Sequence, residues 1–166
     1  MIDMQDLMCY SQANFVSKMK KMGWLTTKDL PKNVAIISIC NTADTICKDE
    51  YHMFEDHPQV LNLNFDDFIP GIHKIKGTVW NLGDGRKAYA FDEKMAKKAV
   101  KFIDKHINSN FYVHCAAGVS RSQAFIRFIE TNYDHEWKTS KLNPCLHPNG
   151  YVLQLLNKVK REQYDE

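Results

Sequence analysis

The chain has 166 residues, of which 44% are hydrophobic and 25% charged, and its formal net charge is +2. These values are typical of one globular domain and exclude a disordered chain, a collagen and a coiled coil. A charge this close to zero also disfavours nucleic acid as the main partner, because nucleic-acid-binding proteins usually carry a strong basic excess. The longest apolar runs, such as residues 34–39, are far shorter than the roughly 20 residues of a membrane span.

Two further features of composition concern location and metals. Acidic side chains at Asp3 and Asp6 stand where a signal peptide would carry basic ones, so we expect a cytoplasmic protein without membrane contact. The five cysteines form no Cys-x-x-Cys pair, which disfavours a disulfide scaffold and a zinc site. The nearest approach to metal-ligand spacing is Cys145-Leu-His147, and we expect no metal and no cofactor.

The first half of the chain shows one helical and two strand-like patterns. Apolar side chains at roughly helical spacing, followed by Gly23, predict a helix over residues 6–22. The apolar, β-branched run at 34–39 predicts a buried strand. The alternating run at 60–65 predicts a second strand. We assign the whole chain, 1–166, to one domain, with residues 1–33 as an N-terminal extension.

The second half begins with a segment that has no sustained period. Residues 66–90 predict a long lid-like loop with a short extended piece near 78–80. Beyond it, periodicity predicts helices at 91–107, 122–133 and 149–163, and a strand at 111–114. Strands separated by helices predict an α/β domain with a central, mostly parallel sheet of about four to five strands flanked by helices. Ligands bind to such sheets where strands end and helices begin.

One segment combines a candidate nucleophile with residues that favour an anion-binding loop. It is residues 112–124, Tyr-Val-His-Cys-Ala-Ala-Gly-Val-Ser-Arg-Ser-Gln-Ala. The five residues between Cys115 and Arg121 allow one turn of chain to curl around a tetrahedral oxyanion. Backbone N–H groups and the positive end of the following helix would bind its oxygens. Gly118 supplies a backbone shape that other residues resist, and the Arg121 fork fits two oxygens.

The same positive field favours the thiolate form of Cys115, which makes that residue the candidate nucleophile. Ser122 would hydrogen-bond the sulfur, and His114 would orient the loop from beneath rather than act as a base. Singly, a buried cysteine or a helix arginine is an ordinary structural residue; the joint pattern is what indicates chemistry. The predicted substrate-binding residues are Ala116, Ala117, Gly118, Val119, Ser120, Arg121 and Ser122.

The run His114-Cys-Ala-Ala-Gly-Val-Ser-Arg-Ser122 resembles the signature of the cysteine-dependent protein tyrosine phosphatase superfamily. It is most similar to the compact dual-specificity branch and its microbial and viral relatives. The resemblance implies a phosphatase-like fold and a metal-independent, two-step hydrolysis of phosphate monoesters through a phosphocysteine. The implied partner is a phosphorylated protein, carrying phosphotyrosine first and phosphoserine or phosphothreonine second. It also implies an aspartate general acid on a separate mobile loop.

Three residues compete for the role of that acid. Asp67 follows the strand at 60–65, where compact relatives place the acid just beyond the neighbouring parallel strand. Asp84 fits the usual spacing to Cys115 better, and its context after Trp80 faintly resembles the Trp-Pro-Asp loop of larger tyrosine phosphatases. We predict Asp67, because loops tolerate insertion whereas strand ends do not move, and we keep Asp84 and Asp66 as alternatives.

Two other functions use the same loop. An RNA 5′-triphosphatase would need a basic groove to bind RNA, and the small net charge disfavours such a groove. A pseudophosphatase would bind phosphoproteins without turnover, but both Cys115 and Arg121 are present. The leading prediction is therefore a protein tyrosine or dual-specificity phosphatase.

Overall fold

The computed structural model describes residues 4–42, 51–70, 78–139 and 147–163. Its elements are, in chain order, β1 (Gln5–Tyr10), α1 (Gln12–Lys21), a single 3-10 turn (Thr27–Asp29), β2 (Val34–Cys40), β3 (Val60–Asn64), β4 (Val79–Asn81), β5 (Lys87–Tyr89), α2 (Glu93–Lys105), β6 (Asn110–His114), α3 (Arg121–Asn132), β7 (Trp137–Thr139) and α4 (Gly150–Glu162).

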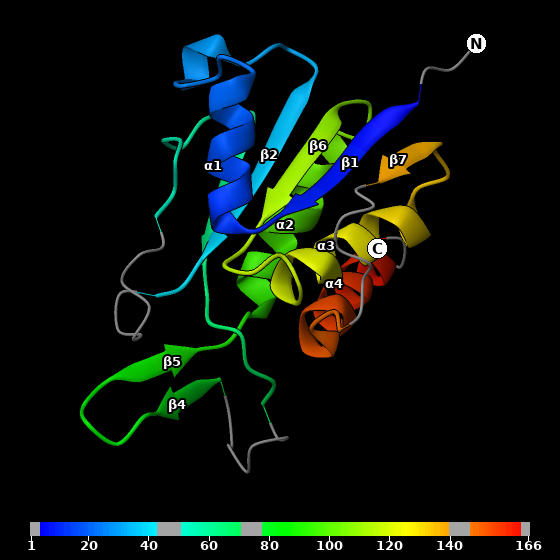
Figure 1. Cartoon of the computed structure of the whole chain (residues 1–166). Helices are drawn as coiled ribbons and strands as arrows, with labels where there is room; N and C mark the ends of the chain where they lie inside the picture. Colours follow the sequence, from blue (N-terminus) through cyan, green and yellow to red (C-terminus); the bar gives the residue numbers. More distant parts are fainter. Residues whose placement is uncertain (1–3, 43–50, 71–77, 140–146, 164–166) are drawn as a thin grey trace.

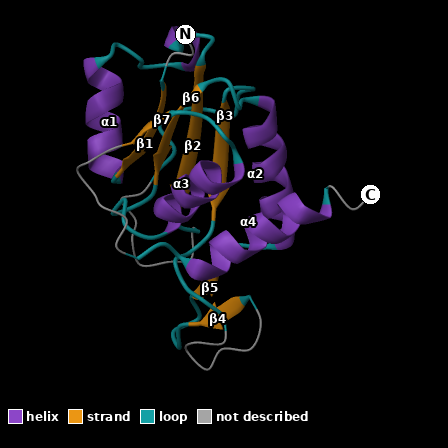
Figure 2. Cartoon of the chain, turned by 90° about the vertical axis from the view of Figure 1, so that its right-hand side faces the viewer, coloured by secondary structure: helices purple, strands orange, loops and turns teal. Residues whose placement is uncertain are grey.

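Five of these strands form one sheet in the order β3-β2-β6-β1-β7, and every neighbouring pair in it is parallel. Helix α1 covers one face, and α2, α3 and α4 cover the other (Figures 1 and 2). Strand β2 is buried along its whole length, which explains its continuous apolar sequence. The predicted α/β domain with a central, mostly parallel sheet flanked by helices is confirmed.

The prediction of one helix over residues 6–22 was wrong in its first part. Residues 5–10 form β1, and only Gln12–Lys21 is helical. Leu7 and Cys9 are buried on one side of β1, and strand pairing on both of its edges outweighs the helical spacing of the apolar residues. The helix then begins after Ser11, whose side chain accepts a hydrogen bond from the Asn14 N–H. The predicted N-terminal extension, residues 1–33, thus contributes an inner strand of the sheet, since Gln5–Tyr10 pairs with both β6 and β7.

The segment 66–90, predicted as a loop, contains an antiparallel hairpin of β4 and β5 that extends beyond the sheet (Figure 1). The extended piece expected near 78–80 corresponds to β4, whereas β5 was not predicted. Asp66 ties the hairpin to the sheet, because its N–H donates to the Tyr89 carbonyl and its carboxylate accepts from the Tyr89 N–H, each at 2.7 Å. The three-residue edge strand β7 was also missed, since it is too short to show a period. None of the helices in the described ranges is long and apolar enough to cross a bilayer.

Candidate functional site

The segment with the candidate nucleophile lies between β6 and α3, at the carboxyl end of the sheet. Strand β6 is the middle strand and ends at His114; α3 begins at Arg121. Residues 115–120 therefore form the strand-to-helix loop that the sequence predicts, which we call the Cys115 loop. Because α3 points its N-terminus at this loop, its dipole favours negative charge there.

The Cys115 thiol is held from two sides. Its Sγ lies 3.0 Å from the Ser122 Oγ and accepts a hydrogen bond from the Gly118 N–H at 3.3 Å. The residue is only 3% exposed, and Ser122 is fully buried. A thiolate in this position would keep both hydrogen bonds, with the Ser122 hydroxyl as a donor. The predicted contact between Ser122 and the sulfur is thus present.

Several backbone N–H groups of the Cys115 loop are not used by the described structure. Within the described residues, the N–H groups of Ala116, Ala117, Val119 and Ser120 donate to no acceptor. Four such donors within five residues, next to a helix N-terminus, are groups of the kind that bind phosphate. These are four of the residues that the sequence predicts to bind substrate.

The N-terminal strand supports the Cys115 loop from below. The Cys115 N–H donates to the Tyr10 carbonyl at 3.4 Å, and the Gln12 N–H donates to the Ala116 carbonyl at 3.0 Å. Gly118 has a φ of +72°, and a Cβ built on it would lie 2.8 Å from backbone atoms of Tyr10 and Ser11. Glycine is thus required twice, by conformation and by space.

Gly118→Ala should destabilise the protein and distort the Cys115 loop. The positive φ alone costs of order 1–3 kcal/mol, and the contact with rigid backbone adds to it. Urea unfolding should show the loss. Gly83→Ala is the matched control, because Gly83 also has a positive φ (+91°) but open space at its Cβ. Equal losses of stability in the two variants would mean that the close contact with Tyr10 and Ser11 does not contribute to the effect.

Arg121 is buried, not a surface residue of the helix. It is 4% exposed, and its Nη1 donates to the Asn41 Oδ1 at 2.7 Å and to the Phe65 carbonyl at 2.8 Å. Asn41 follows β2 and Phe65 follows β3, so the guanidinium lies where three strand ends converge. A buried guanidinium at the ends of these strands, one residue after the Cys115 loop, is a group that can bind two oxygens of an oxyanion.

Asp67 lies against the Cys115 loop. Its Oδ1 accepts a hydrogen bond from the Ser120 Oγ at 2.9 Å and another from the Asn149 Nδ2 at 2.8 Å. Asn149 caps α4 through its side chain, and its own N–H donates to the Ser120 carbonyl. The exposed Asp67 carboxyl is therefore fixed beside the loop by groups from two other segments.

The two alternative acids have other partners. Asp66 is 5% exposed and accepts hydrogen bonds from the Thr42 N–H, the Thr42 hydroxyl and the Tyr89 N–H. Asp84 lies in the exposed turn of the hairpin and forms an ion pair with Arg86. The hydrogen bonds from Arg86 hold the pKa of Asp84 below its usual value, which disfavours the protonated form that a general acid needs.

His114 lies under the loop in a buried polar chain. Its Nε2 is 2.6 Å from the Ser38 Oγ, which is also 2.7 Å from the Nδ1 of His52, and its ring stacks on Phe15. Burial lowers the pKa of His114 to about 4, and the nearby His52 and Arg121 act in the same direction, against a hydrogen bond with the Cys115 carbonyl. The imidazole is thus neutral at neutral pH, which fits a residue that orients the loop.

A neutral buried histidine makes stability depend on pH. Because the pKa of His114 is lower in the folded state (about 4) than in the unfolded chain (6.5), its contribution is complete above pH 6.5 and is lost as the pH falls toward 4. We expect stability to fall by about 2 kcal/mol between pH 7 and pH 5 from this residue alone. Denaturant unfolding of His114→Gln should show a correspondingly flatter pH dependence. His147→Gln, which removes an exposed histidine, should keep the full slope; identical slopes in both variants would contradict the assignment.

Two residues that contact the site, Asn149 and Cys9, lie outside the sequence motif at 114–122 and were not predicted to belong to the site. Asn149 was expected only as the start of the last helix, where asparagine is a preferred cap. Cys9 was placed in a predicted helix, but its Sγ lies on β1, 3.1 Å from the Ser122 Oγ and 3.6 Å from the Gly118 carbonyl. Cys9 and Cys115 thus contact the same serine hydroxyl. Cys145, considered above with His147, lies outside the described residues.

The described residues include no group of three or more His, Cys, Asp or Glu side chains that could hold a metal ion. Comparison with known proteins gives no family: no protein-family model and no curated protein matches the chain. The function of the chain is therefore inferred from its own residues.

Proposed function

We propose that the chain is a cysteine-dependent phosphatase that hydrolyses phosphate monoesters on protein side chains, phosphotyrosine first and phosphoserine or phosphothreonine second. The observation that carries the proposal is the position of the Cys115 sulfur. It lies between the Ser122 hydroxyl and the Gly118 N–H, in a loop that ends at the buried Arg121. The resemblance of residues 114–122 to the tyrosine phosphatase signature supports the same chemistry.

In the proposed first step, the Cys115 thiolate attacks phosphorus and forms a sulfur–phosphorus bond, while the bond from phosphorus to the substrate oxygen breaks. Asp67 gives its proton to that oxygen, so an alcohol or phenol leaves and Asp67 becomes a carboxylate. The N–H groups of the Cys115 loop and the guanidinium of Arg121 bind the phosphoryl oxygens, where negative charge is concentrated. The hydrogen bonds that Asp67 accepts from Ser120 and Asn149 hold its carboxyl against the Cys115 loop.

In the second step, water attacks the phosphocysteine and the sulfur–phosphorus bond breaks. Asp67 takes a proton from the attacking water and returns to its acid form, and inorganic phosphate leaves. The Ser122 hydroxyl, 3.0 Å from the sulfur, donates a hydrogen bond to the departing thiolate. His114 takes no proton in either step, since its imidazole is neutral and its Nε2 is paired with the buried Ser38 hydroxyl.

Hydrolysis of an aryl phosphate by the purified chain tests the proposal directly. We expect turnover that a chelator leaves unchanged and that phosphate or vanadate inhibits competitively. A rate that falls with the chelator and returns with added metal would contradict the mechanism. A phosphotyrosine peptide and an RNA with a 5′-triphosphate, tested side by side, distinguish the proposed substrate from the RNA alternative. Tight binding of the phosphopeptide without turnover would indicate a binding module.

A further inference from the structure

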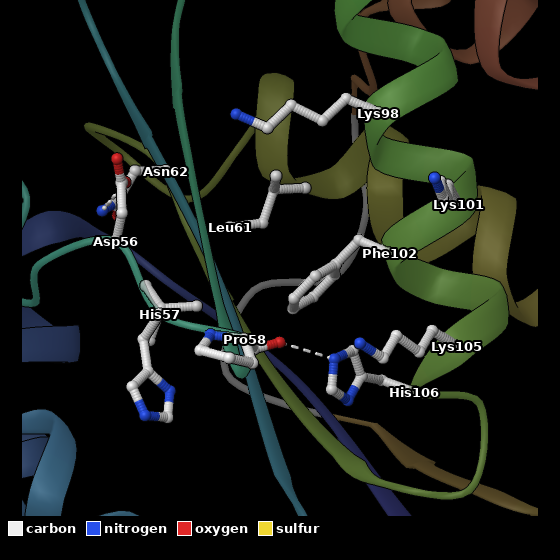
Figure 3. A pocket seen from close by; sticks show the side chains of 11 residues that line it. Asp56, His57, Pro58, Leu61, Asn62, Lys98, Lys101, Phe102, Lys105 and His106 are labelled. Atoms are coloured by element: carbon white, nitrogen blue, oxygen red, sulfur yellow. Dashed lines mark hydrogen bonds between the residues drawn. The ribbon is translucent and has the colours of Figure 1, made fainter.

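A groove runs along the outer edge of the sheet, between β3 and α2. It consists of two cavities of about 520 and about 350 Å³, which share Asn62 and Lys98 in their walls. Figure 3 shows the larger cavity, with Lys98 reaching from α2 toward the strand and with Leu61 and Phe102 between the two elements. No residue of the Cys115 loop lines either cavity, so this edge groove is separate from the site described above.

The strand side of the groove presents backbone groups that can pair with another strand. In the described part of the chain, β3 is one of the two edge strands of the five-stranded sheet. The Gln59 carbonyl accepts from β2 and the Phe65 N–H donates to β2, so the odd-numbered residues of this segment face their partner strand. Because backbone groups alternate in direction along a strand, Asn62 and Asn64 direct theirs outward. An edge of this kind is a template for an added strand.

The helix side of the groove carries a stripe of positive charge. Residues three and four apart lie on one face of a helix, and the groove is lined in this way by Lys94, Lys98, Lys101 and Lys105. All four are exposed, and none forms an ion pair with an acid among the described residues. The four charges are therefore available to a partner, in a chain whose net charge is only +2.

The two acids of the groove do not cancel this charge. Asp56 accepts a hydrogen bond from the Asn62 side chain at 3.0 Å. Asp92 caps α2, where its Oδ1 accepts from the Met95 N–H at 2.8 Å. Four lysines against two engaged carboxylates leave the groove positive. Between the charges, Leu61 and the half-buried Phe102 offer apolar contact.

We propose that the edge groove binds an acidic, extended segment of a partner protein. The segment adds to the sheet beside β3, pairs with the backbone of Asn62 and Asn64, and places its carboxylates against the lysine stripe. A polypeptide fits better than a nucleic acid, because only a polypeptide matches the backbone donors and acceptors of a sheet edge. Charge complementarity then selects acidic sequences.

The position of the groove connects it with catalysis. Strand β3 leads directly into Asp66 and Asp67, so a segment bound along β3 extends toward the end of the sheet at which the Cys115 loop lies. We infer that the preferred substrates carry an acidic stretch within a few residues of the phosphorylated side chain. This extension rests on the proposed phosphatase function, whereas binding of an acidic segment does not.

Binding is tested with a fluorescent, unphosphorylated peptide in which glutamate and threonine alternate. The fluorescence anisotropy of this peptide, measured at low salt, gives its affinity for the chain. The triple variant Lys98→Gln/Lys101→Gln/Lys105→Gln should bind it about tenfold more weakly. The matched control, Lys18→Gln/Lys20→Gln/Lys21→Gln, removes the same charge from exposed positions on α1 and should change the affinity less than about twofold. Equal weakening in both variants, or no binding by the unaltered chain, would overturn the proposal.

Two further measurements make the test specific. Hydrogen exchange of the Asn62 and Asn64 amides should slow when the peptide is bound, which a purely ionic contact with α2 would not cause. A single-stranded RNA that binds more tightly than the peptide and loses affinity in the same triple variant would assign the groove to nucleic acid instead.

The link with catalysis has its own readout. With phosphotyrosine peptides, an acidic flank should raise kcat/KM, and the groove variant should lose this advantage while its aryl phosphate hydrolysis stays unchanged. An advantage that survives in the groove variant would contradict the link. Absence of aryl phosphate hydrolysis in the unaltered chain would refute the phosphatase function, yet leave the peptide-binding result standing.

Discussion

Replacing Cys115 by serine should abolish phosphate monoester hydrolysis and leave the fold intact. The serine hydroxyl can keep the contacts with the Ser122 Oγ and the Gly118 N–H, so the loop retains its shape. A neutral hydroxyl without an adjacent base is a poor nucleophile compared with a thiolate, and we expect less than about one per cent of the original rate. Aryl phosphate turnover measures the loss, and urea unfolding verifies the fold.

Cys40→Ser is the control for this substitution. Cys40 is also buried and is the last residue of β2, and its sulfur contacts the side chains of His52 and Gln12. The same change of sulfur to oxygen should therefore leave the rate within about twofold. A Cys115→Ser variant that keeps several per cent of the activity would mean that another group attacks phosphorus.

Asp67→Asn should slow hydrolysis of natural phosphopeptides by about 10²–10⁴-fold, the usual contribution of a positioned acid. Asparagine keeps an oxygen that can accept from Ser120 and Asn149, so the variant removes the proton without removing the contacts. An aryl phosphate with a weakly basic leaving group should be affected far less, because that group needs little protonation. The basic limb of the pH–rate profile should flatten as well.

Asp84→Asn, made in parallel, should lose less than about tenfold and keep the bell-shaped profile. Its carboxylate is already engaged by Arg86, in the turn of the hairpin. The reverse outcome would move the acid to Asp84, and it would mean that spacing in the sequence predicts the acid better than strand topology does. Small, equal losses in both variants would point to Asp66.

The parts of the fold that the sequence predicts are those with a long, regular pattern. The buried run of β2 and the amphipathic helix α2 carry their periods over several residues, and both were predicted close to their actual bounds. Strand β1 was not, because its six residues are followed at once by a helix and the combined spacing resembles a single helix. The choice between strand and helix there depends on β6 and β7, which are far away in the sequence.

The residues of the candidate site likewise fall into those that a local sequence pattern predicts and those that it does not. Cys115, Gly118 and Arg121 belong to one continuous loop, so their spacing alone indicated an anion-binding turn. The approach of Asp67 to that loop followed from the rule that parallel strands end at a common edge. The hydrogen bond from Asn149 to Asp67 depends on how α4 packs against α3, and no local sequence pattern predicts that packing.

Strand β1 is synthesised well before the two strands that pair with it, β6 and β7. Its partner β6 is joined to it by hydrogen bonds between residues 104 positions apart, as from the Asp6 N–H to the Asn110 side chain. The Cys115 loop rests on the end of β1, so a nascent chain must hold that strand unpaired until β6 has emerged. Contacts of such high sequence separation form late and slow the folding of a domain. Competence to bind an oxyanion should therefore be among the final properties that the folding chain acquires.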